Sequence, residues 1–183
     1  MAAYVLGHQL KGERDRLALM SELLDPMHRR HIEALGVLKP GARTLEVGCG
    51  NGTISSWLAQ RITPGGVAVA VDLDLSLLDV RAPNLELRQA DIVIGAIEPG
   101  NFDLVTARAV LHHVRDAEAA IRNLVASMRA GGGLLLIEPD FLPVSIAEPT
   151  EIRLFWEQWL AWSREQAKQC SIIAEGFLYR AAN

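Results

Sequence analysis

The stretch TLEVGCGNGT, from Thr44 to Thr53, decides how the rest of the chain is interpreted. A short apolar run is followed by three glycines at every second position, Gly48, Gly50 and Gly52. The run predicts a buried strand, and glycines between a strand and a helix let the backbone approach a ligand closely. The stretch therefore predicts a loop that binds a nucleotide-like cofactor.

The residues after the last glycine limit which cofactor this is. A phosphate-binding P-loop requires a lysine and then Ser or Thr at that point, whereas Gly52 is followed by Thr53 and Ile54. This excludes an ATPase of that kind. A dinucleotide fingerprint places a third glycine where Thr53 stands. That spacing weakens a dinucleotide site but leaves it open, since the third glycine can vary.

Apolar runs and helical patterns alternate on both sides of this loop. The pattern predicts strands at residues 44–47, 67–73, 84–91, 102–107 and 133–138. It predicts helices at residues 16–35, where Pro26 breaks or kinks the run, and at 53–62 and 117–128, with a turn at RAGG, 129–132. Residues 74–83 hold at most two helical turns. Nearly all-apolar strands separated by helices predict an α/β fold, a doubly wound, mostly parallel sheet that binds its ligand at the carboxyl ends of the strands.

Composition narrows the class of protein. At 183 residues the chain is one domain by length, and half of its residues are hydrophobic. The net charge of −4 and the lack of a basic run argue against a nucleic-acid partner. Cys49 and Cys170 lie far apart, without metal-ligand spacing, which favours a reducing compartment and no metal. We see no secretory signal or membrane span, so we expect a cytoplasmic protein.

Five motifs stand in order along the chain: LEVGCGNG (45–52), VDL (71–73), QADI (89–92), FDLVTARAVLHHV (102–114) and GGGLLLIEPD (131–140). Together they resemble the motifs of class I S-adenosylmethionine-dependent methyltransferases, and within that class the small-molecule and quinone-type enzymes. The resemblance covers roughly residues 4–160. It implies a Rossmann-like sheet with helices on both faces, S-adenosylmethionine as the cofactor and a small-molecule substrate.

The resemblance also implies which residues bind the cofactor: Glu46, Gly48, Gly50, Gly52, Asp72, Leu73, Asp91, Ile92, Ala107 and Arg108. The glycines would line the methionine and ribose. Asp72 would accept hydrogen bonds from the ribose hydroxyls, and Asp91 from the adenine amine. Ile92 would pack on the adenine ring and donate its backbone N–H. Carbonyls near Ala107 and Arg108, with Glu46 through water, would hold the ammonium group.

His112 and His113 are the candidate catalytic residues. Methyl transfer from a sulfonium is a direct displacement, so alignment of the reacting atoms contributes most to the rate. An acceptor that carries a proton also needs a base to remove it, and histidine is such a base. Consecutive helical residues point about 100° apart, so at most one of the two should face the cofactor. The alternative is a helix start with one histidine packed and the other capping or solvated.

Aromatic residues mark the later part of the chain. Trp156, Trp159 and Trp162 stand three apart beside Phe155. They predict either core packing and a partner surface, or an aromatic wall for an apolar or planar substrate.

We expect three parts within the single domain 1–183: a helical lid segment (1–35), a cofactor-binding core (36–140), and a helical cover with a short tail (141–183). Tyr4 and His8 would lie near the cofactor if the N-terminal segment forms the lid, and in a frayed terminus otherwise.

The sheet of this family normally has seven strands, and too few residues follow Glu138 to complete it. We therefore expect a sheet with incomplete C-terminal strands, and a homodimer formed through its open edge or through the Trp-bearing helix. The first functional expectation is methyl transfer to a small molecule. The alternatives are a non-catalytic or truncated S-adenosylmethionine-binding subunit and an NAD(P)-dependent oxidoreductase.

Overall fold

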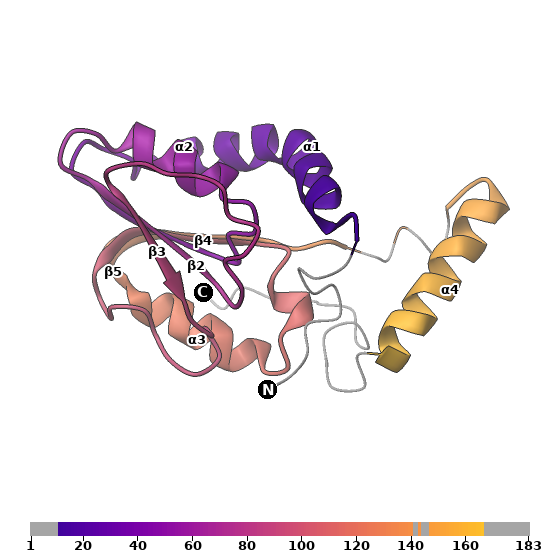
Figure 1. Ribbon diagram of the computed structural model, residues 1–183. Coiled ribbons are helices and arrows are strands. Elements are labelled where there is room, and N and C mark those ends of the chain that lie inside the picture. The colour runs from indigo at the N-terminus through magenta and orange to yellow at the C-terminus, as the bar shows by residue number, and fades with distance from the viewer. Residues whose placement is uncertain (1–10, 141–142, 144–146, 167–183) are drawn as a thin grey trace.

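The computed structural model describes residues 11–140, 143 and 147–166, with side chains in the last helix described up to residue 161. Helices and strands alternate along the chain (Figure 1). In order they are α1 (Glu13–Ala34), β1 (Arg43–Val47), α2 (Thr53–Arg61), β2 (Val67–Asp72), β3 (Leu85–Gln89), β4 (Phe102–Arg108), the 3₁₀ helix η1 (Leu111–His113), α3 (Ala117–Ser127), β5 (Met128–Ile137) and α4 (Thr150–Gln166).

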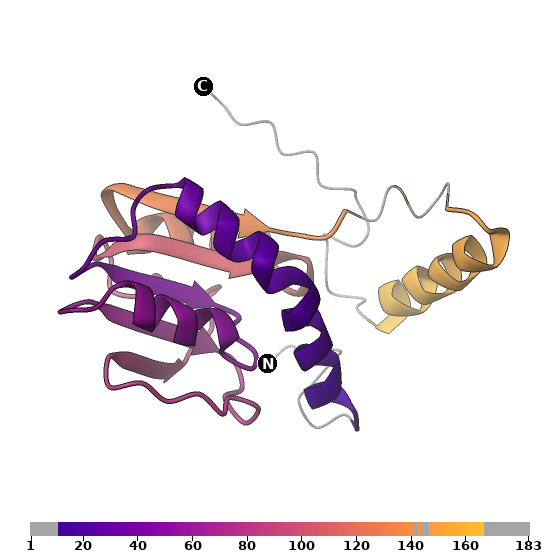
Figure 2. The ribbon, with the colours of Figure 1, turned by 90° about the horizontal axis from the view of Figure 1, so that it is seen from above.

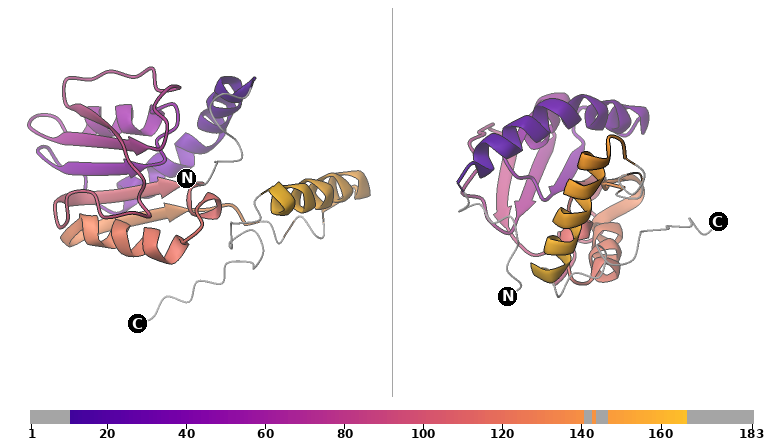
Figure 3. Two further views of the ribbon diagram at one scale, coloured as in Figure 1. Left: turned by 60° about the horizontal axis from the view of Figure 1, so that its bottom comes forward. Right: turned by 90° about the vertical axis from the view of Figure 1, so that its right-hand side faces the viewer.

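The five strands form one sheet in the order β3-β2-β1-β4-β5, and every neighbouring pair is parallel. Helices α1 and α2 cover one face, and α3 covers the other (Figures 1 and 2). This confirms the predicted doubly wound α/β sheet. Helix α4 lies apart from the sheet, on the side to which the strands point (Figure 3).

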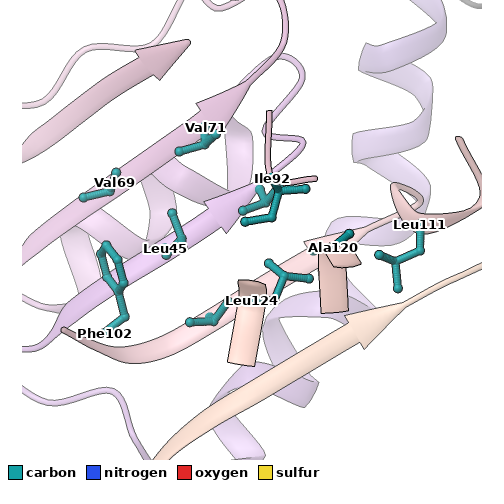
Figure 4. Close-up of a cluster of buried hydrophobic side chains, with 11 residues drawn as sticks. Leu45, Val69, Val71, Ile92, Phe102, Leu111, Ala120 and Leu124 are labelled. Carbon is teal, nitrogen blue, oxygen red and sulfur yellow. The ribbon is translucent and has the colours of Figure 1, made fainter. Parts of the chain in front are cut away.

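Two cores lie on opposite faces of the sheet because successive strand residues point to opposite sides. The α3 face buries Leu45, Val69, Val71, Phe102 and Leu124, together with Ile92 from the loop after β3 (Figure 4). The face under α1 and α2 buries a second set, which includes Ile32, Ile54, Leu58, Ile62, Ala68 and Leu104. Of the apolar residues in the predicted second helix, Ile54, Leu58 and Ile62 are buried in this core, and Trp57 is partly buried against it.

Helix α1 forms where the sequence predicts a helix. Of the two effects predicted for Pro26, a break does not occur, although proline lacks the N–H of one helical hydrogen bond. Packing on both sides of the proline, by Asp25 and Ile32, offsets that loss. The apolar residues of this run, which keep a helical period, do not all face inward, since Leu23 is 65% exposed. The helix instead buries Glu13, Ser21, Asp25, His28 and Ile32, which is mainly a polar stripe.

The prediction for the start of β5 is wrong. A turn was expected at residues 129–132, but the strand begins at Met128. Its register against β4 shifts there, since Phe102 pairs with Met128 and Leu104 pairs with Gly133. Gly131 has a φ of 76°, a left-handed conformation that glycine adopts without strain. The glycine-rich segment therefore forms a bulge within the strand instead of a turn before it.

Between β2 and β3 the described chain holds turns and no helix, which agrees with the weak helical signal at residues 74–83. Among the described helices, none is long and apolar enough to cross a membrane.

Candidate functional site

The site lies where the chain changes direction across the sheet. From β1 the chain proceeds to β2 and β3 on one side, and it later returns to β4 and β5 on the other. In open α/β sheets, ligands bind at the carboxyl ends of the strands at such a switch point. The loop of residues 48–52 follows β1 there, and the turn of residues 109–113 follows β4.

The glycine loop needs its glycines for two separate reasons. Gly48, Gly50 and Gly52 have φ angles of 70°, 52° and 81°, in the left-handed region that other residues rarely adopt. A Cβ at Gly48 would also overlap Val110, and one at Gly52 would overlap Val80. The sequence suggested that these glycines let the backbone approach a ligand. At Gly48 and Gly52 the backbone instead lies close to side chains of the protein itself.

Asp72 ends β2 beside this loop. Its Oδ2 accepts a hydrogen bond from the N–H of Gly50 at 2.8 Å, and its Oδ1 accepts one from the N–H of Leu73 at 2.7 Å. The structure thus brings Asp72 and the glycine loop together, as the order of the motifs requires. Leu73 is 48% exposed.

Asp91 and Ile92 form the next corner of the same edge. Asp91 Oδ1 accepts a hydrogen bond from the N–H of Val93 at 2.9 Å, which explains why β3 ends before residue 91. Ile92 is only 3% exposed, and its carbonyl accepts a hydrogen bond from Asn123 Nδ2 at 2.7 Å. The Ile92 side chain is thus part of the core on the α3 face, with a small surface toward the site.

Glu46 lies in β1 on the face covered by α2. It is 4% exposed, and Ser55 Oγ donates a hydrogen bond to its Oε2. Burial raises the pKa of Glu46 to about 8, against the opposing effects of the Ser55 hydrogen bond and the charge of Arg108. The neutral carboxyl form is therefore favoured near neutral pH.

Arg108 at the end of β4 forms a buried ion pair with α1. Its Nη1 lies 2.9 Å from Asp25 Oδ1, with side chains 13% and 7% exposed. The two atoms do not meet at hydrogen-bonding angles, so the contact is ionic. Asp25 Oδ2 also accepts a hydrogen bond from Arg29 Nη2 at 3.2 Å. Ala109 follows with a φ of 55°, a strained turn for a residue with a Cβ.

A second buried contact joins α1 to β4. His28 is fully buried, and its Nε2 lies 2.8 Å from Thr106 Oγ1. The Thr106 hydroxyl donates its hydrogen to the carbonyl of Leu135 at 3.1 Å, so His28 Nε2 must be the donor. Nδ1 is then an acceptor, and it has no hydrogen-bond partner among the described residues. Burial, together with the charge of Arg108, lowers the pKa of His28 to about 4.

A hollow of about 410 Å³ lies between α1 and the glycine loop. Its lining is mostly polar and includes Ser21, Glu22, Asp25, Arg29, Asn51 and Thr53. Ser21 Oγ donates to Asn51 Oδ1 at 3.1 Å, which fixes the helix to the loop. The sequence analysis missed these α1 residues. No local signal separated the two faces, because the polar residues at 21, 25 and 28 and the apolar residues at 17, 20, 24 and 27 both follow a helical period.

Both histidines lie on η1, directly beyond β4. His112 is 8% exposed, and its Nδ1 lies 2.6 Å from Glu138 Oε2. The two histidine rings lie 3.8 Å apart. Burial lowers the pKa of His113 to about 3, with smaller contributions from the charges of His112 and Arg16. The sequence analysis missed Glu138 as a site residue, although an acid directly after an apolar strand is the same signal that indicated Asp72.

Cys49 belongs to the loop of residues 48–52 and is buried, and burial raises the pKa of its thiol. Other residues singled out in the sequence lie farther from this edge or outside the described part. In α4, the Trp156 and Trp159 rings meet edge to face at 5.5 Å, and Phe155 is 60% exposed. Outside the described residues lie Tyr4, His8 and the tail after residue 166, and the side chain of Trp162 is not described either.

Two similar curated proteins are both named ubiquinone biosynthesis O-methyltransferase. The protein from Coxiella burnetii (strain Dugway 5J108-111) is 34% identical over 119 residues, which cover 61% of this chain and 49% of that protein. The protein from Xanthomonas campestris pv. campestris (strain B100) is 36% identical over 132 residues, covering 68% and 54%. The chain thus spans about half the length of these relatives.

Solved structures agree on the fold. A putative sarcosine dimethylglycine methyltransferase from Galdieria sulphuraria matches with a TM-score of 0.58 at 16% identity, over 92% of this chain and 68% of that one. A putative S-adenosyl-L-methionine-dependent methyltransferase from Methanococcus maripaludis matches with a TM-score of 0.56 at 18% identity, over 87% and 80%. The family model described as a methyltransferase domain matches residues 15–183. The chain therefore belongs to the methyltransferase domain family.

Proposed function

We propose that this protein transfers a methyl group from S-adenosylmethionine to a small-molecule acceptor. One observation carries the proposal: Asp72 contacts the glycine loop directly, Asp91 follows β3 along the same edge of the sheet, and residues 48–53 contain no lysine. S-adenosylmethionine has no phosphate, and it presents hydroxyls, an amine and positive charges. Hydrogen-bond acceptors therefore suit it, whereas a dinucleotide or nucleoside triphosphate needs donors for its phosphates.

In this proposal the cofactor lies along the carboxyl edge of β1, β2 and β3. The glycine loop lines its ribose and methionine part, and Asp72 accepts hydrogen bonds from the ribose hydroxyls. Asp91 accepts from the adenine amine, while Ile92 packs on the ring and donates its N–H. The cofactor supplies an activated methyl carbon, and these residues hold that carbon in place for attack.

The methionine end fits the hollow beside α1. The carbonyls of Ala107 and Arg108, with Glu46, accept from the ammonium group in this arrangement. Asp25 and Arg29 border the hollow with opposite charges, which suits an amino-acid group that carries both an ammonium and a carboxylate. The buried Asp25 Oδ1, which has an ion pair but no hydrogen bond, supports the fit.

The acceptor would enter beside η1, where His112 and His113 lie at the ends of β4 and β5. The curated relatives are named O-methyltransferases, so we propose an acceptor hydroxyl.

We also propose that the segments 1–35 and 141–183 cover the substrate. Two copies of the chain associate through the sheet edge or through α4 in this proposal. The acidic net charge and separate cysteines support a cytoplasmic location without a nucleic-acid partner.

The proposal is tested by incubating the full chain with S-adenosylmethionine labelled in the methyl group and a panel of phenols, catechols and amines. Label in an organic product and release of S-adenosylhomocysteine are the expected results. Binding of the cofactor without turnover of any acceptor would support a non-catalytic binding subunit instead. The variant Asp72→Ala is the matched negative control, because it removes the proposed ribose contact.

A further inference from the structure

Glu138 directly follows β5, and its carboxylate contacts the turn of residues 109–113, which carries both histidines. Its Oε1 accepts hydrogen bonds from the N–H of Val110 at 2.9 Å and of Leu111 at 2.8 Å. Its Oε2 lies 2.6 Å from His112 Nδ1. One carboxylate from the neighbouring strand thus fixes both the backbone of the turn and the ring of one histidine.

The protonation states follow from this geometry. Burial alone would raise the pKa of Glu138, but the hydrogen bonds from the His112 side chain and from the N–H groups of Leu111 and Val110 outweigh it, and the pKa is lowered. An ionised carboxylate has no hydrogen to donate. The hydrogen between the two groups therefore belongs to His112 Nδ1, and Nε2 is the basic atom of the neutral ring.

The two histidines differ in their surroundings. The structure gives His112 a carboxylate partner, whereas burial and the charges of His112 and Arg16 lower the pKa of His113 to about 3. A base that weak gains little from taking a proton near neutral pH. His113, Glu138 and Arg16 are the titratable and charged groups of the neighbouring elements that bear on this choice, and together they favour His112.

The turn also lies at the cofactor loop. A Cβ at Gly48 would overlap Val110, two residues before His112, so the two loops are in direct contact. The side chains of His112 and Glu138 are 11% and 22% exposed, so the pair borders the surface at the carboxyl edge of the sheet. An acceptor hydroxyl placed for attack on the methyl group would approach at this edge.

We propose that Glu138 is a positioning residue for the transfer and that His112, held by it with hydrogen on Nδ1, is the base. This rests on the proposed function. As the acceptor oxygen forms its bond to the methyl carbon, the carbon–sulfur bond breaks and its electron pair stays on sulfur. The hydroxyl proton passes to His112 Nε2, and the ionised Glu138 stabilises the imidazolium until it releases that proton to solvent. The substrate class is a weakly acidic hydroxyl such as a phenol.

The first test does not require turnover. In Glu138→Gln the amide oxygen can still accept from the backbone of the turn, but the NH₂ group faces His112 Nδ1 and donates to it. The ring hydrogen should then move to Nε2. Long-range ¹H–¹⁵N spectra of histidine-labelled protein, assigned with His112→Asn, report the tautomer. We expect the Nδ1–H form in the wild type and the Nε2–H form in Glu138→Gln. An Nε2–H form in both would overturn the proposal.

The second test measures the rate with S-adenosylmethionine and 3,4-dihydroxybenzoate as a catechol probe. We expect kcat to fall about 10²- to 10⁴-fold in Glu138→Gln, with KM for S-adenosylmethionine within about twofold. Glu138→Asp should recover part of the rate, and Glu118→Gln, at a side chain 84% exposed, is the matched surface control.

The outcomes separate this inference from the proposed function. A folded Glu138→Gln protein that binds S-adenosylhomocysteine normally and keeps the wild-type kcat would overturn the role of Glu138 while methyl transfer stands. A wild-type protein without turnover of any acceptor would overturn the proposed function, and the tautomer spectra would still decide whether Glu138 positions His112.

Discussion

Asp25 of α1 and Arg108 of β4 form a buried ion pair with Nη1 and Oδ1 2.9 Å apart. The contact places a carboxylate from the N-terminal helix at the switch point of the sheet. Together with the His28–Thr106 contact, it fixes the helix that forms one wall of the hollow beside the glycine loop. The site is thus built by α1 as well as by the strand-end motifs.

Removing one partner of this pair should destabilise the fold strongly. Asp25→Ala leaves the buried guanidinium of Arg108 without its countercharge, and breaking such a pair costs about 3–5 kcal/mol. The free energy of unfolding in urea measures the loss. The double variant Asp25→Leu/Arg108→Met should cost less than the single one, because the buried charge of Arg108 is removed as well. Arg29, whose side chain is 39% exposed, loses its contact with Asp25 in both variants. A single variant as stable as the wild type would contradict the ionic contact.

Alanine variants at two glycines should separate the cost of backbone strain from the cost of steric overlap. Gly48→Ala combines a φ of 70° with overlap of Val110, whereas Gly100→Ala has a similar φ of 72° but nothing within 4 Å of the added Cβ. The overlap should cost about 1–3 kcal/mol beyond the shared strain. Urea unfolding of both variants measures the difference. Equal losses would mean that Val110 moves aside freely.

Glu46 should make the fold less stable as the pH rises. Its pKa is raised to about 8 by burial, so between pH 4.5 and 8 the folded state holds a proton that the unfolded state has lost. From pH 6.5 to 8 the wild type should lose about 2 kcal/mol relative to Glu46→Gln. Urea unfolding of both proteins at several pH values gives this difference. A constant difference across that range would show that Glu46 is ionised in the fold.

His28 should act in the opposite direction. Burial lowers the pKa of His28 to about 4. Between pH 6.5 and 4, His28 is therefore protonated in the unfolded state and neutral in the folded state. This group's contribution to stability is complete above pH 6.5 and decreases by about 3 kcal/mol as the pH falls to 4. His28→Gln should remove that decrease. The comparison uses urea unfolding at pH 7, 5.5 and 4.5, and parallel curves for both proteins would disprove it.

Variants of Asp91 should show whether the site binds S-adenosylmethionine or a nicotinamide dinucleotide, because only the first proposal uses Asp91. Losing a hydrogen bond to the adenine amine costs about 1–2 kcal/mol, which is roughly a tenfold weaker affinity for S-adenosylmethionine in Asp91→Ala. Asp91→Asn keeps an oxygen that can accept both from the amine and from the N–H of Val93. It should therefore bind within about threefold of the wild type. Calorimetry of the three proteins measures this, and equal affinity in all three would exclude Asp91 from the adenine site.

The strands and the cofactor motifs were predictable because their signals are local. Apolar runs such as residues 67–72 and the glycine spacing at 48–52 report the sheet and its loop without knowledge of distant contacts. The face of α1 was not predictable in this way. Its apolar residues suggested one stripe, while the buried charge of Arg108 on another element determines that the polar stripe with Asp25 lies inside.

Glu138 shows the same limit within the site. The sequence places an acid after the last strand, but only the parallel pairing of β4 with β5 brings it within 2.6 Å of His112. The bulge at the start of β5 depends likewise on pairing, since the glycines there suggest a turn until the partner strand is known. A local pattern can mark an acid at the end of a strand, but the residue that this acid contacts depends on which strands pair.

Calorimetric titration of the full chain with S-adenosylmethionine, with NAD as the control, tests the central claim most directly. The account predicts micromolar binding of S-adenosylmethionine, with one site per chain and no heat from NAD. Binding of NAD in place of S-adenosylmethionine, or no binding of S-adenosylmethionine by a folded sample, would contradict it.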